Sequence, residues 1–211
     1  MNSNIFEDHP IRLIIDLIKN NIIPENSFLN FSRHIYSYKT QYEKRELFQI
    51  KASELSQEWF LNEINKLEPE WELTFHSDVS LINDETKFLP LIDFNIENMD
   101  EEIIDIITDR FLKQKKLSDF QDILHNLEVF ESGSSYHGYA KRIVTKDQWF
   151  KFTIAILLLN YTKYNLTNNI IVDTRWVAHR LLSGYTCLRW SNNSNTKSKL
   201  PTFYRTGIIR G

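Results

Sequence analysis

The chain has 211 residues, of which 42% are hydrophobic and 13% aromatic, and it carries a formal net charge of −3 with a pI near 6.1. This length and composition predict a globular protein of one large domain or two small ones, and they exclude a disordered chain and a strongly basic nucleic-acid binder. The single cysteine, Cys187, excludes an internal disulfide and a multi-cysteine zinc site.

The N-terminus lacks the basic region and the apolar stretch of a signal peptide. The longest apolar run, residues 152–160, has about half the length that spans a membrane. We therefore expect a cytoplasmic protein with no membrane partner.

From the N-terminus, apolar residues at helical spacing predict helices over residues 10–20 and 53–67. Alternating runs predict strands over 33–38 and 45–51. Ser53 is a suitable N-cap for the second helix.

From residue 71 the pattern changes to strands. Alternation predicts a strand over 71–81, and an apolar run that turns acidic at its end predicts another over 88–95. A helix is predicted over 100–116, because acidic residues at its start and basic residues at its end match the helix dipole. Two strands, 127–131 and 136–142, flank a tight turn and form a hairpin.

The remaining residues predict two helices and two strands before a polar loop over 192–199 and a tail. These elements are a helix over 145–162, a strand over 170–173, a helical segment over 175–182 and a strand over 186–191. Helices and hairpin-linked strands are interspersed without a break in composition, which predicts a single α+β domain over 1–211 with a mostly antiparallel sheet. The alternative for residues 1–50 is an added N-terminal lobe.

The hairpin holds two of the chain's five glycines, Gly133 and Gly138. Glycine is favoured where the backbone needs a positive φ or where another group approaches closely. Because side chains alternate along a strand, Ser135 and His137 project from one face, where both can donate hydrogen bonds to phosphate oxygens. The alternative is an ordinary surface hairpin.

Three polar side chains follow one another at every second position at the end of the 88–95 strand. If the strand continues, Asp93, Asn95 and Glu97 share one face. Oxygen ligands in this arrangement suit a hard cation such as Mg²⁺ or Mn²⁺. The alternative is a polar strand end that precedes a helix.

Two further groups have the chemistry of a phosphate or metal site. An apolar strand ends in Asp173, which suits a metal ligand or general base, or alternatively caps the next helix. Arg189, Lys197 and Lys199 lie among small polar residues and suit contact with phosphates. The alternative for this last group is a solvated loop.

The order of these groups resembles the archaeo-eukaryotic primase superfamily, the primase-polymerases. The pattern reads Asp93-x-Asn95, Ser135-x-His137, a lone Asp173 after apolar residues, then an arginine and a lysine. The resemblance covers about residues 70–200 and implies a catalytic core with an RNA-recognition-like sheet flanked by helices.

The resemblance also implies site roles and a reaction. Asp93 and Asp173 would be catalytic metal ligands for Mg²⁺ or Mn²⁺, with Asn95 and Glu97 as further candidates. Ser135, His137, Arg189 and Lys197 would bind the phosphates of a nucleoside triphosphate. The implied chemistry is two-metal attack of a 3′-hydroxyl on the α-phosphate, on a DNA or RNA template. The implied role is in DNA replication, with a helicase or other replication protein as a partner.

This sequence departs from the family at Asn95, where the family has a second carboxylate. A neutral amide binds a divalent cation less strongly because it lacks the charge. Glu97 lies on the same predicted face and is a candidate replacement.

Three hypotheses follow. The first is a template-dependent nucleotidyltransferase that acts as a primase or polymerase. The second is a catalytically degenerate primase-like domain that binds nucleotide or nucleic acid. The third is an α+β interaction protein with no phosphate site, and it predicts that His137 and Arg189 lie far from Asp93.

Overall fold

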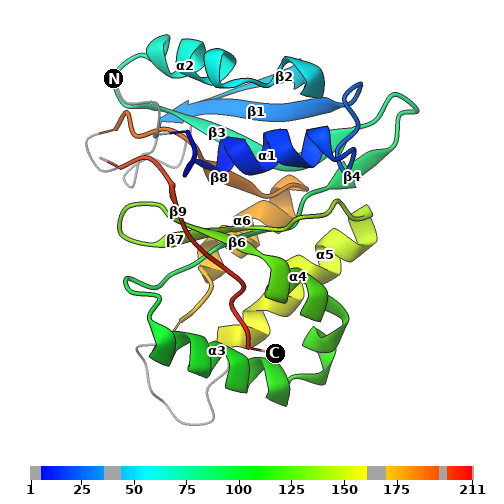
Figure 1. The fold of residues 1–211 in the computed structure, drawn as a ribbon, viewed down its shortest axis with the longest axis vertical. Helices are drawn as coiled ribbons and strands as arrows, with labels where there is room; N and C mark the ends of the chain where they lie inside the picture. The colour runs from blue at the N-terminus through cyan, green and yellow to red at the C-terminus, as the bar shows by residue number, and fades with distance from the viewer. Residues whose placement is uncertain (1–5, 36–43, 161–169, 195–198, 211) are drawn as a thin grey trace.

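Two antiparallel sheets and their flanking helices form the frame of the chain in a computed structural model (Figure 1). The structure describes residues 6–35, 44–160, 170–194 and 199–210. The α+β class predicted from the sequence is confirmed. The single mostly antiparallel sheet expected from the strand pattern is instead divided into two.

Sheet A is built around a central strand, β3, in the strand order β2-β1-β3-β4, and β8 also pairs with β3. Its strands are β1 (Phe28–Ile35), β2 (Arg45–Lys51), β3 (Trp71–Ser80), β4 (Thr86–Phe88) and β8 (Cys187–Arg189). The strands β1 and β2 come from the N-terminal part of the chain, and β8 comes from the C-terminal part. Sheet A therefore joins segments that are distant in the sequence.

Sheet B has the strand order β5-β7-β6-β9. Its strands are β5 (Leu91–Asp93), β6 (Glu128–Glu131), β7 (Tyr136–Tyr139) and β9 (Thr202–Thr206). The hairpin predicted from the sequence is confirmed as β6 and β7. The strand β9 lies in the C-terminal segment, for which the sequence pattern predicts only a tail.

The predicted strand over 88–95 is interrupted in the middle. Leu89 and Pro90 separate β4, which pairs with β3 in sheet A, from β5, which pairs with β7 in sheet B. Proline has no N–H to contribute to a sheet, so the chain changes from one sheet to the other at this point. This crossing explains why the expected single sheet is two sheets.

Within the described residues, six α-helices flank the two sheets. They are α1 (Pro10–Lys19), α2 (Gln57–Asn65), α3 (Glu101–Lys113), α4 (Gln121–Asn126), α5 (Lys146–Ala155) and α6 (Thr174–Ser183). Of these, α1 packs in the core that the sheets share. Short 3-10 turns occupy Ala52–Glu54, Lys115–Phe120 and Ile156–Asn160. In Figure 1, α2 lies above sheet A and α3 lies below sheet B, and α5 runs from the level of sheet B down towards α3.

Two helix boundaries differ from those predicted. The second helix begins after Ser56, whose Oγ accepts a hydrogen bond from the Trp59 N–H at 3.0 Å, so the predicted cap Ser53 lies in the preceding 3-10 turn. The helix predicted over 145–162 is α-helical to Ala155 and continues as a 3-10 helix. Residues 36–38 of the first predicted strand and 161–162 of this helix lie outside the described residues.

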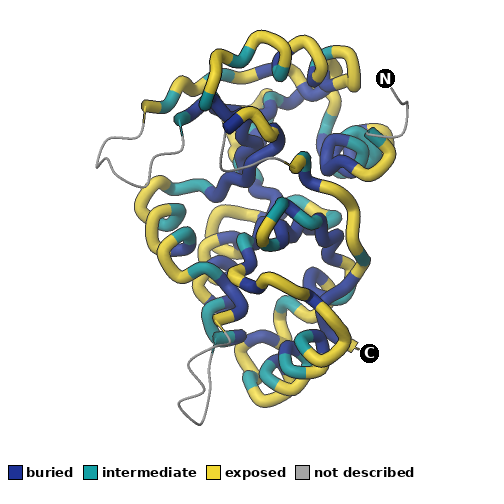
Figure 2. The backbone as a smooth tube through the Cα atoms, turned by 90° about the vertical axis from the view of Figure 1, so that its left-hand side faces the viewer, coloured by how far each residue is buried: buried dark blue, intermediate teal, exposed yellow. Residues whose placement is uncertain are grey.

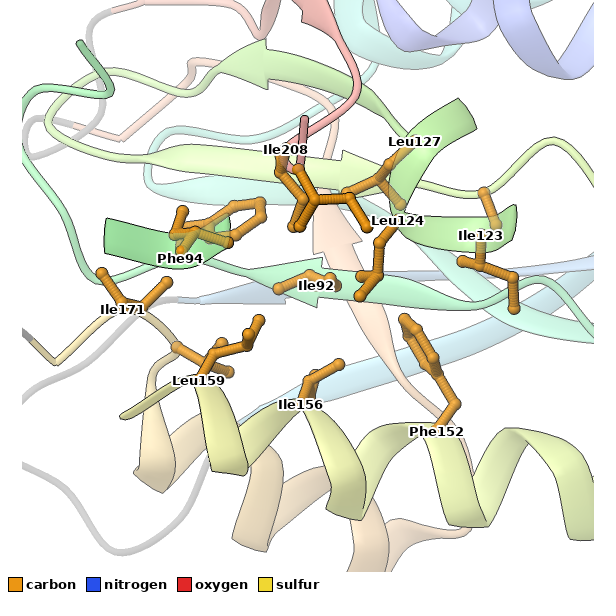
Figure 3. Close-up of a cluster of buried hydrophobic side chains, with 14 of the residues drawn as sticks. Ile92, Phe94, Ile123, Leu124, Leu127, Phe152, Ile156, Leu159, Ile171 and Ile208 are labelled. Atoms are coloured by element: carbon orange, nitrogen blue, oxygen red, sulfur yellow. The ribbon is translucent and has the colours of Figure 1, made fainter. Parts of the chain in front are cut away.

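Sheet B separates two hydrophobic cores because consecutive side chains of its strands point to opposite faces. Leu91 contributes to the core that sheet B shares with sheet A and α1, whereas Ile92 contributes to the core on the other side. Figure 3 shows this second core, which includes Ile92, Phe94, Leu124, Ile156 and Ile208. In Figure 2, the buried stretches run through the interior and the outer helical turns are exposed.

Candidate functional site

The hairpin and β5 bring Asp93 and His137 together. The two residues are direct partners in the antiparallel β5–β7 pairing, and Asp93 Oδ1 lies 3.9 Å from His137 Nε2. Both side chains line a pocket between the two sheets. His137 is buried, whereas Asp93 is partly exposed. The sheet register therefore places a carboxylate and an imidazole in one site.

Both glycines of the hairpin have the roles predicted for them. Gly133 has φ +113° in the turn, a conformation that side-chain-bearing residues rarely adopt. A Cβ atom on Gly138 would lie 2.6 Å from Leu127 Cδ2 and 3.1 Å from Phe94 Cε2. Gly138 thus allows β7 to pack closely on the core beneath the site.

Ser135 lines the same pocket, and its side chain also holds the backbone at the end of β5 in place. Its hydroxyl donates a hydrogen bond to the backbone carbonyl of Phe94, the residue after Asp93. The hydroxyl oxygen keeps acceptor capacity, but its proton is engaged in this bond. Ser135 therefore ties the hairpin turn to the end of β5, and its predicted contact with phosphate stays a prediction.

Asp173 lies directly beside Asp93 in the backbone pairing. The Asp173 N–H donates to the Asp93 carbonyl at 3.0 Å, next to an isolated antiparallel bridge between Phe94 and Val172. Because Phe94 and Val172 are buried in the core, alternation directs the side chains of Asp93 and Asp173 to the opposite face. The predicted 170–173 strand is reduced to this single bridge.

The alternative role of Asp173 as a helix cap is confirmed, whereas its role as a metal ligand stays a prediction, and it is not among the pocket-lining residues. Its Oδ1 accepts hydrogen bonds from the backbone N–H groups of Arg175 at 2.8 Å and Trp176 at 3.0 Å, at the start of α6. The second carboxylate oxygen is not used by these two bonds. Capping by Oδ1 is therefore compatible with a further role for the other oxygen.

Asn95 and Glu97 do not line the pocket. Both are exposed, whereas Phe94 and Ile96 are buried, so the predicted alternation continues beyond the end of β5 at Asp93. Within the described part of the chain, no group of three or more His, Cys, Asp or Glu side chains is arranged to hold a metal ion. The roles of Asn95 and Glu97 as metal ligands stay predictions.

Arg189 lines the pocket from β8 and is 9% exposed. Its guanidinium donates hydrogen bonds to the backbone carbonyls of Ser132, Ser191 and Lys199, the last at 3.1 Å. Burial lowers the pKa of Arg189, although the negative charges of Glu72 and other nearby groups oppose this effect. Arg189 thus joins β8, the hairpin turn and the C-terminal segment.

The loop after β8 is held by a buried carboxylate. Glu72 of β3 accepts hydrogen bonds from the Ser191 hydroxyl and from the backbone N–H groups of Asn193 at 3.2 Å and Ser194 at 2.8 Å. These bonds fix the start of the loop that contains Lys197. Lys197 itself lies outside the described residues.

The structure adds pocket residues that the sequence patterns did not single out. They are His34 of β1, Arg45 of β2, Thr74 of β3, and Trp176 and Arg180 of α6. The contacts of Arg45 are long-range, since it lies 142 residues from Cys187, whereas Arg180 contacts Cys187 from only seven residues away. No local periodicity reports the long-range contact of Arg45, whereas Arg180 begins the arginine-then-lysine segment, 180–197, of the primase resemblance.

The charge of the pocket is mainly positive. Three arginines line it, and Asp93 is the only carboxylate among its described lining residues. The neighbouring His76 has its pKa lowered to about 3, first by burial and then by the charges of Arg45 and Arg180. His76 is therefore neutral near pH 7, and the field of the pocket favours an anion.

Among the comparisons with known proteins, one family model matches the chain. This model, described as AEP-like, archaeo-eukaryotic primase 1D-like, matches residues 51–202, which is more than half of the chain. No curated protein and no solved structure matches the chain. Within the described residues, no helix has the length and apolar character needed to cross a membrane.

Proposed function

The chain belongs to the archaeo-eukaryotic primase 1D-like family, and from this premise we propose that it binds a nucleoside triphosphate in the pocket between its two sheets. The observation that carries the proposal is the convergence of Asp93, His137 and three arginines from separate elements on one pocket. A triphosphate is strongly anionic, and guanidinium and imidazole groups donate hydrogen bonds to phosphate oxygens. The net positive lining of the pocket supports this ligand class.

A divalent cation would be held by Asp93, which lines the pocket, by the adjacent Asp173 and by the nucleotide itself. Proteins usually bind Mg²⁺ through one or two carboxylates together with substrate phosphates, rather than through an all-protein cage. Asp93 and Asp173 are two such carboxylates on adjacent backbone segments. We assign them as the ligands of Mg²⁺ or Mn²⁺. When bound, such a cation neutralises the phosphate charge and assists transfer of the nucleotide to a 3′-hydroxyl.

The chain's own residues would bind and orient the nucleotide. His137 faces Asp93 and would donate a hydrogen bond to a phosphate oxygen. Arg189 would supply positive charge from its buried position. Ser135 would keep the end of β5 fixed through its bond to the Phe94 carbonyl, so that Asp93 keeps its position relative to the phosphates.

Two reactivities are consistent with this binding site. The first is nucleotidyl transfer as in a primase or polymerase, and it is favoured by the pairing of Asp93 with Asp173. The second is nucleotide binding without catalysis, and it is favoured by the neutral Asn95 and by the location of Glu97 outside the pocket lining. Membership of the family also supports nucleic-acid binding. A DNA or RNA template and a replication partner such as a helicase therefore remain part of the proposal.

The test measures binding and transfer separately. Equilibrium binding of labelled nucleoside triphosphate is measured with Mn²⁺ or Mg²⁺, and primer extension and de novo priming are measured on DNA and RNA templates. Asp93→Asn removes the proposed ligand charge, and Asp84→Asn, in an exposed turn, is the matched control. If primer extension is lost in Asp93→Asn and kept in wild type and Asp84→Asn, the result supports nucleotidyl transfer. Binding without any product supports the second reactivity, and wild-type protein that binds no nucleotide contradicts both.

A further inference from the structure

Two arginines from opposite ends of the chain converge on one sulfur atom in the pocket. Arg180 Nη1 of α6 lies 2.7 Å from Cys187 Sγ, and Arg45 Nη1 of β2 lies 3.7 Å from the same atom. All three residues line the pocket that contains Asp93. Cys187 therefore marks a point where two guanidinium groups come close together.

Two like charges in one partly enclosed pocket repel each other, and an anion between them removes this repulsion. The histidine beside them is neutral near pH 7, because burial and both arginines lower the pKa of His76 to about 3. His76 is therefore uncharged, and it neither adds to nor neutralises the positive charge of the two arginines. The pair has the electrostatic character of an anion subsite.

Arg180 and Arg189 differ in how their N–H groups are used. Arg189 donates to three backbone carbonyls, which commits much of its guanidinium to holding the fold. The Nε atom of Arg180 is buried and has no hydrogen-bond partner among the described residues, and its one described side-chain hydrogen bond goes to Cys187 Sγ. A sulfur atom is a weak acceptor, so a phosphate oxygen is a better partner for Arg180.

We propose that Arg180 and Arg45 form a polyphosphate subsite that contacts the terminal phosphates of the bound nucleotide. This inference rests on the proposed function, because it assigns residues to the triphosphate placed in the same pocket. It also assigns direct phosphate contact to Arg180, whereas Arg189 acts mainly by holding the pocket and by its charge. Arg45 precedes residue 51, where the family match begins, so part of this subsite lies outside the matched segment.

The subsite predicts that the full-length chain binds inorganic tripolyphosphate as well as ATP. Isothermal titration calorimetry with both ligands compares wild type with Arg180→Ala, Arg45→Ala and Arg180→Lys. Arg175→Ala is the matched control, because Arg175 is an exposed arginine on the same helix and does not line the pocket. A guanidinium–phosphate contact is a strong charged hydrogen bond, so each alanine variant is expected to weaken binding of both ligands by about tenfold or more.

The variant Arg180→Lys distinguishes the effect of the positive charge from the effect of the guanidinium geometry. Arg180→Lys keeps the charge without the planar fork and is expected to bind between wild type and Arg180→Ala. Arg175→Ala is expected to bind as wild type does. If wild type binds ATP and both Arg180→Ala and Arg45→Ala bind it equally well, the subsite is refuted while nucleotide binding stands. If wild type binds neither ligand, the proposed function fails and the subsite fails with it.

Discussion

Asp93 and His137 face each other across β5 and β7, with Asp93 Oδ1 3.9 Å from His137 Nε2. The sheet register alone creates this relationship, because the two residues are opposite partners in adjacent antiparallel strands. A separate bridge between Phe94 and Val172, with the hydrogen bond from the Asp173 N–H to the Asp93 carbonyl, places Asp173 beside Asp93. One short strand of three residues, β5, thus holds together the proposed metal-binding and phosphate-binding halves of the site.

Two variants of Asp173 separate its cap from its charge. Asp173→Asn keeps a side-chain oxygen that caps α6, because Asn and Asp are about equally good N-caps. We expect its melting temperature to stay near wild type, whereas Mn²⁺-dependent nucleotide binding is weakened. Asp173→Ala loses the cap as well, at about 1 kcal/mol of the free energy of unfolding. Thermal unfolding and nucleotide titration of both variants check this, and unchanged nucleotide binding in Asp173→Asn would remove Asp173 from the site.

Arg189 is expected to matter for stability. Arg189→Ala leaves three backbone carbonyls without their donor in a buried position. The expected loss is about 3 kcal/mol of the free energy of unfolding, which lowers the melting temperature by roughly 10 °C in a chain of this size. Arg142→Ala removes a surface ion pair with Asp122 and is expected to cost about 1 kcal/mol or less. Equal melting temperatures for the two variants would contradict this role.

Gly138 is expected to reject a side chain. A methyl group there would meet Leu127 and Phe94 at less than the normal contact distance, in a core with little free space. Gly138→Ala is expected to reduce the free energy of unfolding by about 1–3 kcal/mol, measured by urea denaturation. Ser134→Ala, at an exposed position in the same hairpin turn, serves as the control and is expected to have a small effect. A Gly138→Ala variant as stable as this control would show that β7 can shift away.

The buried histidine His76 predicts a pH dependence of stability. Its pKa is lowered from 6.5 to about 3 in the folded protein, so below pH 6.5 the unfolded state binds a proton that the folded state does not. Stability is therefore expected to fall as the pH decreases from 6.5 towards 3, by up to about 1.4 kcal/mol per pH unit for this group. His76→Gln is expected to make the dependence of unfolding free energy on pH less steep over that range. An unchanged slope would mean that His76 is protonated in the folded state.

Local patterns predicted the parts of the site that lie on single elements. The hairpin at 127–142 was identifiable because its glycines have local causes, a positive φ at Gly133 and a close approach at Gly138. The ordered positions of Asp93, Ser135 and His137 were sufficient to indicate a primase-like chain before any fold was known. The prediction of the third hypothesis, that His137 and Arg189 lie far from Asp93, is wrong because all three residues line one pocket.

The sequence did not predict the division into two sheets or the arginine pair. The apolar run at 88–95 looks like one strand, because alternation does not show that Pro90 moves the chain from one sheet to the other. The pair of Arg45 and Arg180 depends on the pairing of β1 with both β2 and β3 and of β3 with β8. Contacts between residues this distant in the chain are set by tertiary packing and leave no periodic signal.

The most direct test of nucleotide binding in this pocket is a crystal structure of the wild-type protein with Mn²⁺ and a non-hydrolysable nucleoside triphosphate. We expect electron density for the phosphates between β5–β7 and β8, with the cation beside Asp93 and Asp173. We also expect the terminal phosphates to contact Arg180. A nucleotide bound elsewhere on the molecule, or an empty pocket at saturating nucleotide, would contradict nucleotide binding between the two sheets.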